Sequence, residues 1–599
     1  MKNAFAIVTL SALLSACAMA PQKPAEPAPA PQPPAPATSA EAESPAPEAA
    51  DTPAPAPEAL PNNELTGDLL YRITKAELEF KQGSWQGPYI TMMALAQQTR
   101  DPRLARRAAE MALTAKQTGE ALSAIRLWRQ LAPDSDEATQ YFLGFAVVAD
   151  NLDEAEAVFE QRLKNAKPEA RPLAMFQMQQ YLLRAKDKDA AFKLQERVLM
   201  PYDGTLEAHL ILAQGAFALN DLTRARAEAS RALAIKPDSE LAILTTAQIS
   251  GDIEAAMKLL TGFLEQYPNA REVRAAYARI LVDNKQYDEA RKQFLTLLKD
   301  QPDNIATLYA LGVLGTQTND LAAAEKYFSR FVAVLEQHPN DERDPSKALM
   351  ILAQIAEQRG DLDAAYNWLE KVDGNDEKIY LAARMKMAVL LARKGQVDQA
   401  RQQLAELQPS DPADQAQVFQ TDAQLLRDAG DHRAAYIVLE NALKRYPDNP
   451  DLLYDFALVA EKLGQVELME KALRQVMIAA PDNQHAYNAL GYSLAERNER
   501  LPEALSLIDK AMKMAPGDPF IMDSMGWVQF RMGNLNEAEG FLRRAYALRN
   551  DPEIAVHLGE VLFAKGDVEG AQKMWKEAHA KDPKNDALKS TLARLNQSL

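Results

Sequence analysis

The sequence predicts an all-α solenoid built from stacked pairs of helices. Small residues, mostly alanine, recur about every 34 positions along the chain, and this period is typical of repeated supersecondary units. From Leu65 onward the apolar residues follow the spacing of amphipathic helices, without the sustained alternation of strands. A proline about 12 residues after many of these alanines ends the helix, because proline lacks the amide donor and clashes with the preceding turn.

The recurring small residue marks the second helix of each predicted unit. In one unit Met469 takes its place. The members are Ala121, Ala155, Ala191, Ala225, Ala256, Ala290, Ala324, Ala365, Ala400, Ala435, Ala504, Ala538 and Ala571.

Three further positions keep a fixed spacing to this alanine, and each has a packing role. A small residue about 12 positions earlier lets the two helices of a unit approach closely, and a large apolar residue four positions later fills the gap to the next unit. Gly or Asn followed by Asp suits the turn, because Gly adopts the left-handed exit and Asp caps the next helix. The small residues are Ala213, Ala278, Gly312, Ala353, Ala388, Ala423, Ala457, Gly526 and Gly559. The helix-ending prolines are Pro133, Pro237, Pro268, Pro302, Pro447, Pro481, Pro516 and Pro583.

This combination of small residue, turn, alanine, large apolar residue and proline resembles the tetratricopeptide repeat. The resemblance covers about 500 residues and implies a superhelical solenoid of roughly 15 helix–turn–helix units with an extended concave surface. We expect an N-terminal array over 63–345 and a C-terminal array over 346–599. The insertion 336–345 between them is either a hinge or a longer loop.

The first 62 residues have a different character. Residues 1–16 have the short basic start and apolar run of a secretory signal peptide. Leu14-Ser15-Ala16-Cys17 resembles a bacterial lipobox, which implies cleavage before Cys17, lipidation of Cys17 and, since Ala18 follows, sorting to the outer membrane. The alternative is an ordinary signal peptide with an incidental cysteine. Residues 17–62 are rich in Pro and Ala with few large apolar side chains, so we expect a disordered tether.

Composition and motif searches argue against several function classes. The net charge of −17 disfavours nucleic acid as a partner, since no basic stripe is present to neutralise phosphates. A single cysteine excludes an intrachain disulfide, and none of the six histidines has metal-ligand spacing. No nucleophile elbow, phosphate-binding loop or dinucleotide fingerprint occurs. We therefore expect no catalytic residues, no metal and no cofactor, and predict that the protein is not an enzyme.

Residues left over from packing are candidates for recognition. Helix phase places six of them on the inner face of two neighbouring C-terminal units, where aromatic and Arg side chains are the usual binding anchors. Inter-repeat core filling is the alternative for the two larger aromatic residues, and inter-repeat hydrogen bonding or solvation for the Asn and Asp. The six are Asn488, Tyr492, Asp523, Trp527, Phe530 and Arg531.

The segments 487–497 and 523–531, with the lipobox and tether, resemble the large proteobacterial tetratricopeptide-repeat outer-membrane lipoproteins of the LbcA-type adaptor class. That resemblance implies protein partners in the periplasm, namely a carboxyl-terminal processing protease and cell-wall hydrolases that are presented to it. Two alternatives stay open: a scaffold lipoprotein for polysaccharide export or for pilus and envelope assembly, and direct peptidoglycan binding.

Overall fold

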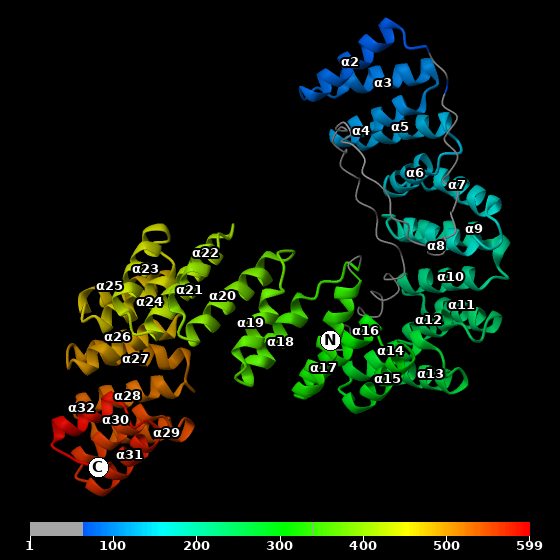
Figure 1. Ribbon diagram of the computed structural model, residues 1–599. Coiled ribbons are helices and arrows are strands. Elements are labelled where there is room, and N and C mark those ends of the chain that lie inside the picture. Colours follow the sequence, from blue (N-terminus) through cyan, green and yellow to red (C-terminus); the bar gives the residue numbers. More distant parts are fainter. Residues whose placement is uncertain (1–60, 62–63, 339–340) are drawn as a thin grey trace, which may run out of the picture. The chain divides into compact units, whose positions relative to one another are not determined.

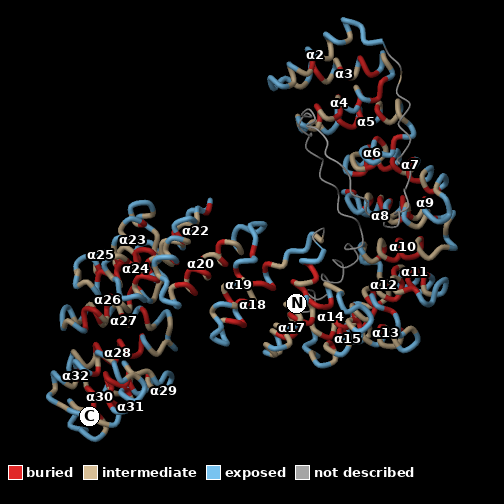
Figure 2. Tube along the Cα trace, in the orientation of Figure 1, coloured by how far each residue is buried: buried red, intermediate tan, exposed pale blue. Residues whose placement is uncertain are grey.

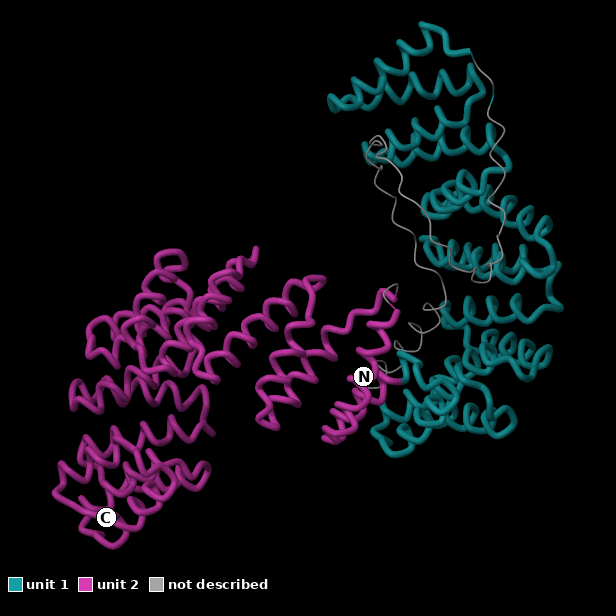
Figure 3. The backbone as a smooth tube through the Cα atoms, viewed as in Figure 1, with its two compact units in different colours: residues 1–307 teal, residues 308–599 magenta. Residues whose placement is uncertain are grey.

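The computed structural model describes residues 61, 64–338 and 341–599. This part of the chain contains thirty-one α-helices, α2 to α32, one short 3₁₀ helix, η2, and no strand. The predicted all-α fold is therefore confirmed. The chain divides into two compact units, Met1–Thr307 and Leu308–Leu599 (Figure 3).

The helices of the first unit and the helix that contains the division are α2 (Gly67–Lys81), α3 (Gln86–Thr99), α4 (Pro102–Thr114), α5 (Thr118–Leu131), α6 (Asp136–Val148), α7 (Leu152–Asn165), α8 (Arg171–Leu182), α9 (Lys188–Leu199), η2 (Met200–Tyr202), α10 (Leu206–Ala218), α11 (Leu222–Ile235), α12 (Glu240–Ser250), α13 (Ile253–Gln266), α14 (Arg271–Asp283), α15 (Tyr287–Asp300) and α16 (Ile305–Gln317).

The remaining helices of the second unit are α17 (Leu321–Gln337), α18 (Ser346–Gln358), α19 (Leu362–Glu370), α20 (Glu377–Arg393), α21 (Val397–Ala405), α22 (Pro412–Asp428), α23 (His432–Arg445), α24 (Pro450–Lys462), α25 (Val466–Ala479), α26 (Gln484–Glu496), α27 (Leu501–Met514), α28 (Pro519–Arg531), α29 (Leu535–Leu548), α30 (Pro552–Ala564), α31 (Val568–Lys581) and α32 (Asp586–Leu595).

Within each unit, consecutive helices form pairs, and each pair packs on the next (Figure 1). The turns between paired helices have the predicted chemistry. Gly360 adopts the left-handed conformation at φ +79°, and the Asp361 side chain then accepts a hydrogen bond from the Ala364 amide at 3.0 Å. Prolines also act as predicted: α27, for example, ends at Met514, two residues before Pro516.

The core lies between the helices of each pair and between successive pairs, where the buried residues face one another (Figure 2). Every alanine of the recurring register is buried. The predicted need for a small partner position is confirmed at Gly526, where an added Cβ would lie 2.6 Å from Leu542 Cγ. Gly312 is equally confined by Phe328, also at 2.6 Å. Each glycine therefore sets how closely its two helices approach.

Three repeats of the first unit depart from this rule, because Leu143, Gln179 and Leu244 occupy the position twelve residues before Ala155, Ala191 and Ala256. Leu143 and Gln179 are buried, and α6–α7 and α8–α9 pack less closely than the pairs built on Ala or Gly at this position, such as α10–α11 and α28–α29. A large side chain there holds the two helices of a repeat apart.

The division at 307/308 differs from the predicted boundary at 345/346, so the insertion 336–345 falls inside the second unit. Residues 339–340 of that insertion lie outside the described residues, and its role as a hinge stays a prediction. The predicted signal peptide, Cys17 and nearly all of the tether also lie outside them. Of the helices in the described ranges, none is both long and apolar enough to cross a membrane.

Candidate functional site

The six predicted site residues lie on α26 and α28, the first helices of two neighbouring repeats. These two helices pack against each other, and α28 also packs against α30, the first helix of the next repeat. Side chains from all three helices form one connected cluster. We call it the α28 cluster, and its members are Tyr492, Glu496, Asp523, Trp527, Arg531 and His557.

A buried ion pair lies at the centre of the α28 cluster. The Asp523 carboxylate is 2.9 Å from His557 Nδ1, and Tyr492 Oη is 3.4 Å from His557 Nε2. Burial alone would lower the pKa of the His557 imidazole, but the charge and hydrogen bond of Asp523 outweigh it and raise that pKa. Burial raises the pKa of the Tyr492 hydroxyl far above its usual range, with Glu496 and Asp523 adding to the effect. The pair thus fastens α28 to α30.

Trp527 connects this pair to the surface. Its ring stacks on the His557 imidazole with centroids 4.3 Å apart, and its indole Nε1 donates to Glu496 Oε2 at 2.7 Å. The Arg531 guanidinium also lies over the Trp527 ring, 4.8 Å from the centroid, and Arg531 Nη2 donates to the Glu496 carbonyl at 3.0 Å. Trp527 is only 2% exposed, so it organises the cluster from within.

The other two predicted residues are half-buried. Phe530 packs against the cores on both sides of α28 and fills space between repeats. Asn488 Oδ1 is buried without a hydrogen-bond partner among the described residues, and so is Arg531 Nε. The structure therefore places Asp523, Trp527 and Phe530 in inter-repeat packing, while Arg531, with the exposed Glu496 beside it, reaches the surface.

The sequence analysis did not predict two members of the cluster, His557 and Glu496. His557 is one of the six histidines that lack metal-ligand spacing, and Glu496 was not among the six candidate residues. The signal that finds them is the repeat period: His557 lies 34 positions after Asp523, and Trp527 lies 31 after Glu496. In a stack of repeats, residues one period apart on first helices are spatial neighbours, so an acid and a base at that separation predict an inter-repeat pair.

The cluster has the chemistry of a structural pair rather than of a catalytic dyad. Both nitrogens of His557 are engaged, one by Asp523 and the other by Tyr492, which leaves none to activate a nucleophile. A second buried histidine, His209, is likewise paired with a carboxylate, 2.7 Å from Glu228. Among the described residues, no group of His, Cys, Asp and Glu side chains is arranged to hold a metal ion.

Comparison with known proteins identifies the helix pairs. Residues 247–312 and 426–491 match a family profile described as tetratricopeptide repeat. The helix pairs within these residues are thus similar to tetratricopeptide repeats. Proteins built from such repeats generally act as scaffolds that bind other proteins.

Relatives of the repeat array come from several bacteria. A TPR repeat-containing protein of Pseudomonas aeruginosa is 40% identical over 210 residues, which is 35% of each chain. Cellulose synthase operon protein C of Pseudomonas fluorescens is 23% identical over 352 residues, 51% of this chain and 27% of that protein. The alignments thus span about a third or less of the two relatives. A solved thermophilic TPR protein of Thermus thermophilus is 26% identical and covers 30% of this chain and 97% of its own, with a TM-score of 0.28.

Proposed function

We propose that this chain is an outer-membrane-anchored periplasmic adaptor that brings a carboxyl-terminal processing protease to cell-wall hydrolase substrates. The observation that carries the binding part of the proposal is the α28 cluster. Three consecutive first helices hold an aromatic and charged group in one fixed arrangement, through hydrogen bonds that span two repeat periods.

The surface of this cluster suits a protein partner. Side chains fixed before binding lose little conformational entropy when a partner docks, and Trp, Tyr and Arg supply most of the binding energy at protein interfaces. The Glu496 side chain is 52% exposed and that of Arg531 is 22% exposed. Phe520, one to two helical turns from Asp523 and Trp527 on α28, is 42% exposed and lies under Arg549 at 4.9 Å. An exposed aromatic ring, with the Arg549 guanidinium over it, is thus available on the same helix.

The anchoring part of the proposal rests on the sequence. A lipid on Cys17 and the Pro/Ala-rich tether would confine the array near the membrane, where two bound proteins meet at a raised effective concentration. This mechanism needs no chemistry from the repeats themselves. It needs only that protease and substrate bind at the same time.

A scaffold for polysaccharide export is the second candidate function. The similarity to cellulose synthase operon protein C, over about half of this chain, favours it. Such a scaffold would use the same face but would bind export or envelope-assembly components instead.

A quantitative pull-down from envelope extract with the full chain tests the proposal. Arg531→Glu reverses the charge at the α28 cluster, and Arg543→Glu is the matched control, since Arg543 also has one carboxylate partner, Glu539 at 2.7 Å, but lies on the second helix α29. We expect the unaltered chain and Arg543→Glu to recover a processing protease and cell-wall hydrolases. We expect Arg531→Glu to recover about tenfold less, which corresponds to about 1.4 kcal/mol of binding energy.

The same experiment separates the alternatives. Recovery of an export porin without a protease would replace the adaptor by the export scaffold. Sedimentation of the purified chain with cell-wall sacculi in the absence of any partner protein would instead indicate direct peptidoglycan binding.

A further inference from the structure

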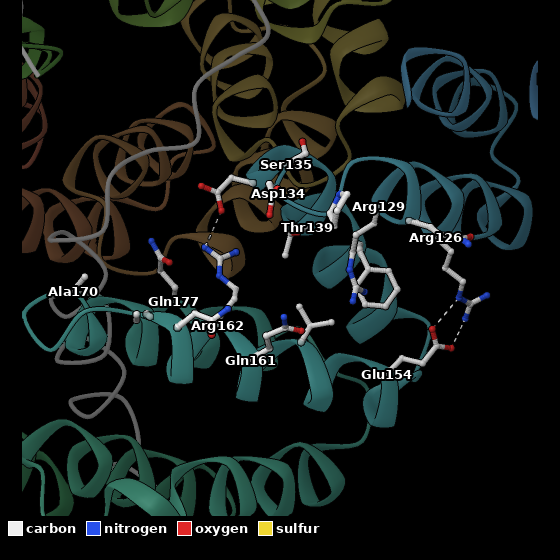
Figure 4. A pocket seen from close by; sticks show the side chains of 18 of the residues that line it. Arg126, Arg129, Asp134, Ser135, Thr139, Glu154, Gln161, Arg162, Ala170 and Gln177 are labelled. Atoms are coloured by element: carbon white, nitrogen blue, oxygen red, sulfur yellow. Dashed lines mark hydrogen bonds and ion pairs between the residues drawn. The ribbon is translucent and has the colours of Figure 1, made fainter. Parts of the chain in front are cut away.

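The first unit contains a cavity of about 800 Å³ formed by α5, α6, α7 and α8 (Figure 4). Its walls come from the C-terminal half of α5, the facing side of α7, and the beginnings of α6 and α8. It therefore lies largely on second helices of two repeats, in another unit from the α28 cluster. The size suits a side chain with its neighbouring backbone rather than a folded domain.

The cavity lies beside a repeat that departs from the small-residue rule. Leu143 stands where closely packed repeats have Ala or Gly, and α6 and α7 pack less closely than those repeats.

Three arginines line the cavity, and they differ in whether a carboxylate pairs with the guanidinium. Arg126 is bound by both oxygens of Glu154 at 2.9 and 2.6 Å, and Arg162 makes a long ion pair of 3.6 Å with Asp136. The Arg129 guanidinium lies over the Phe142 ring at 4.4 Å and, among the described residues, makes no hydrogen bond or ion pair. Figure 4 shows Arg129 and Arg162 directed into the same space, with Gln161 between them.

Burial lowers the pKa of the Arg129 guanidinium, and Glu154 offsets this only in part. That carboxylate is itself held by Arg126. A half-buried guanidinium with five donors and no acceptor keeps the full cost of its lost hydration. An incoming carboxylate would replace that hydration with two parallel hydrogen bonds.

Apolar side chains also line this cavity. Leu173, on α8, is 63% exposed, and the buried Phe142 and Val158 form part of the wall. A cavity lined by a large exposed leucine and by an arginine without a carboxylate partner suits a ligand that has both an apolar group and a negative charge.

We propose that this cavity binds a peptide segment that carries both a carboxylate and an apolar side chain. Arg129 pairs with the carboxylate, and Leu173 covers the apolar group. The carboxylate is either a chain terminus or an Asp or Glu side chain, which share this chemistry. The site goes beyond the adaptor face on α28 and does not depend on which proteins bind there.

Fluorescence anisotropy with defined peptides and the purified full chain tests the proposal. The probes are fluorescein-labelled Gly-Ser-Ala-Ala-Leu with a free C-terminus, its C-terminal amide, and an amidated Gly-Ser-Leu-Asp-Ala. We expect binding of at least one carboxylate peptide, about tenfold stronger than that of the neutral amide, because charge-assisted hydrogen bonds are the strong ones. Comparison of the two carboxylate peptides distinguishes a terminus from a side chain.

Variants separate binding from folding. Arg129→Gln should weaken the carboxylate peptide about tenfold, while Arg129→Lys, which keeps the charge, should weaken it less. Arg279→Gln is the matched control, since burial also lowers the pKa of Arg279 but its side chain does not line the cavity. Leu173→Ser, an exposed substitution, should weaken the binding of Gly-Ser-Ala-Ala-Leu, because it removes the apolar contact proposed for the leucine of the peptide.

Equal binding of acid and amide peptides, equal binding by Arg129→Gln and Arg279→Gln, or no binding of any peptide would overturn the proposal. These peptides contain no envelope protein, so a failed pull-down at the α28 cluster leaves this result unaffected.

Discussion

The repeats α28–α29 and α6–α7 differ at one position of the repeat, and the consequences are opposite. Gly526 lets α28 and α29 approach until an added Cβ would overlap Leu542, and α28 is held in a closed network with α26 and α30. Leu143 stands at the same position in α6–α7, these two helices pack less closely, and a cavity lies beside them. The closely packed repeat thus holds side chains in a fixed network, and the loosely packed repeat borders an open pocket.

The same contrast appears in two arginines that each lie over an aromatic ring. Arg531 covers Trp527 and donates to Glu496, so its charge is met within the fold. Arg129 covers Phe142 and has no such acceptor among the described residues. The donors of Arg531 are thus used within the fold, whereas those of Arg129 are available for a ligand.

Breaking the ion pair of the α28 cluster should have the largest effect. Asp523→Ala leaves the His557 imidazole buried without its partner, and such losses cost about 3 to 5 kcal/mol. Hydrogen exchange of α28 and α30 should accelerate accordingly. Asp509→Ala, which removes an exposed pair with Lys513 on α27, should change exchange by less than about 1 kcal/mol. Equal effects of both substitutions would contradict a structural role for the pair.

Removal of the small residue should have the next largest effect. Gly526→Leu places a side chain against Leu542 and the Ala538 carbonyl, and overpacking of this kind costs about 1 to 3 kcal/mol. Gly540→Ala on α29 is the control, because an added Cβ there meets nothing within 4 Å. We expect it to stabilise the helix by about 0.5 to 1 kcal/mol. Unfolding followed by hydrogen exchange of α28 and α29 measures both, and stabilisation by Gly526→Leu would contradict the close-approach explanation.

The pH dependence of the α28 cluster should be smaller but of definite sign. In the folded protein the pKa of His557 is raised above the usual histidine value of about 6.5, so the proton stabilises the folded state. That contribution is fully present below about pH 6.5 and is lost as the pH rises through the raised folded value. Exchange protection of α30, corrected for intrinsic rates, should therefore fall above pH 6.5.

Asp523→Asn supplies the control for this titration. Without the carboxylate the pKa of His557 loses its main upward contribution, and the pH dependence of α30 should flatten. The pH profile of α10, which carries the His209 pair with Glu228, should not change. A profile of α30 that keeps its slope in the variant would assign the effect to another group.

The smallest difference should come from the two arginines themselves. Arg531→Gln removes a charged hydrogen bond and a cation–π contact, and we expect a loss of about 1 kcal/mol near α28. Arg129→Gln removes a cation whose burial is poorly compensated, so local stability around α5 should stay within about 0.5 kcal/mol. A large loss for Arg129→Gln would mean that its charge is already used by the fold.

Much of the fold could be predicted from the sequence, because packing positions recur with the repeat and each recurrence adds independent support. Gly360-Asp361 and Pro516 have local conformational causes, and their predicted roles are confirmed. The α28 cluster could be predicted only in part. The helix phase predicts that Trp527 and Asp523 lie on the inner face, whereas in the structure both are buried against partners one repeat away, Glu496 and His557.

The cavity was missed for a related reason. It lies beside the repeat whose small-residue position holds Leu143, and the spacing of the repeats alone does not predict a pocket there. Arg129 has no carboxylate partner among the described residues because the nearby carboxylate of Glu154 is bound by Arg126. A single sequence does not show which charged residues pair with one another.

The comparative pull-down from envelope extract tests the central claim most directly, namely that the α28 cluster presents a protein-binding face. The account predicts that a processing protease and its hydrolase substrates are recovered with the unaltered chain and with Arg543→Glu, and that Arg531→Glu loses about nine-tenths of them, the tenfold change expected for one anchor. Recovery that is equal in all three, or that contains neither protein, would contradict it.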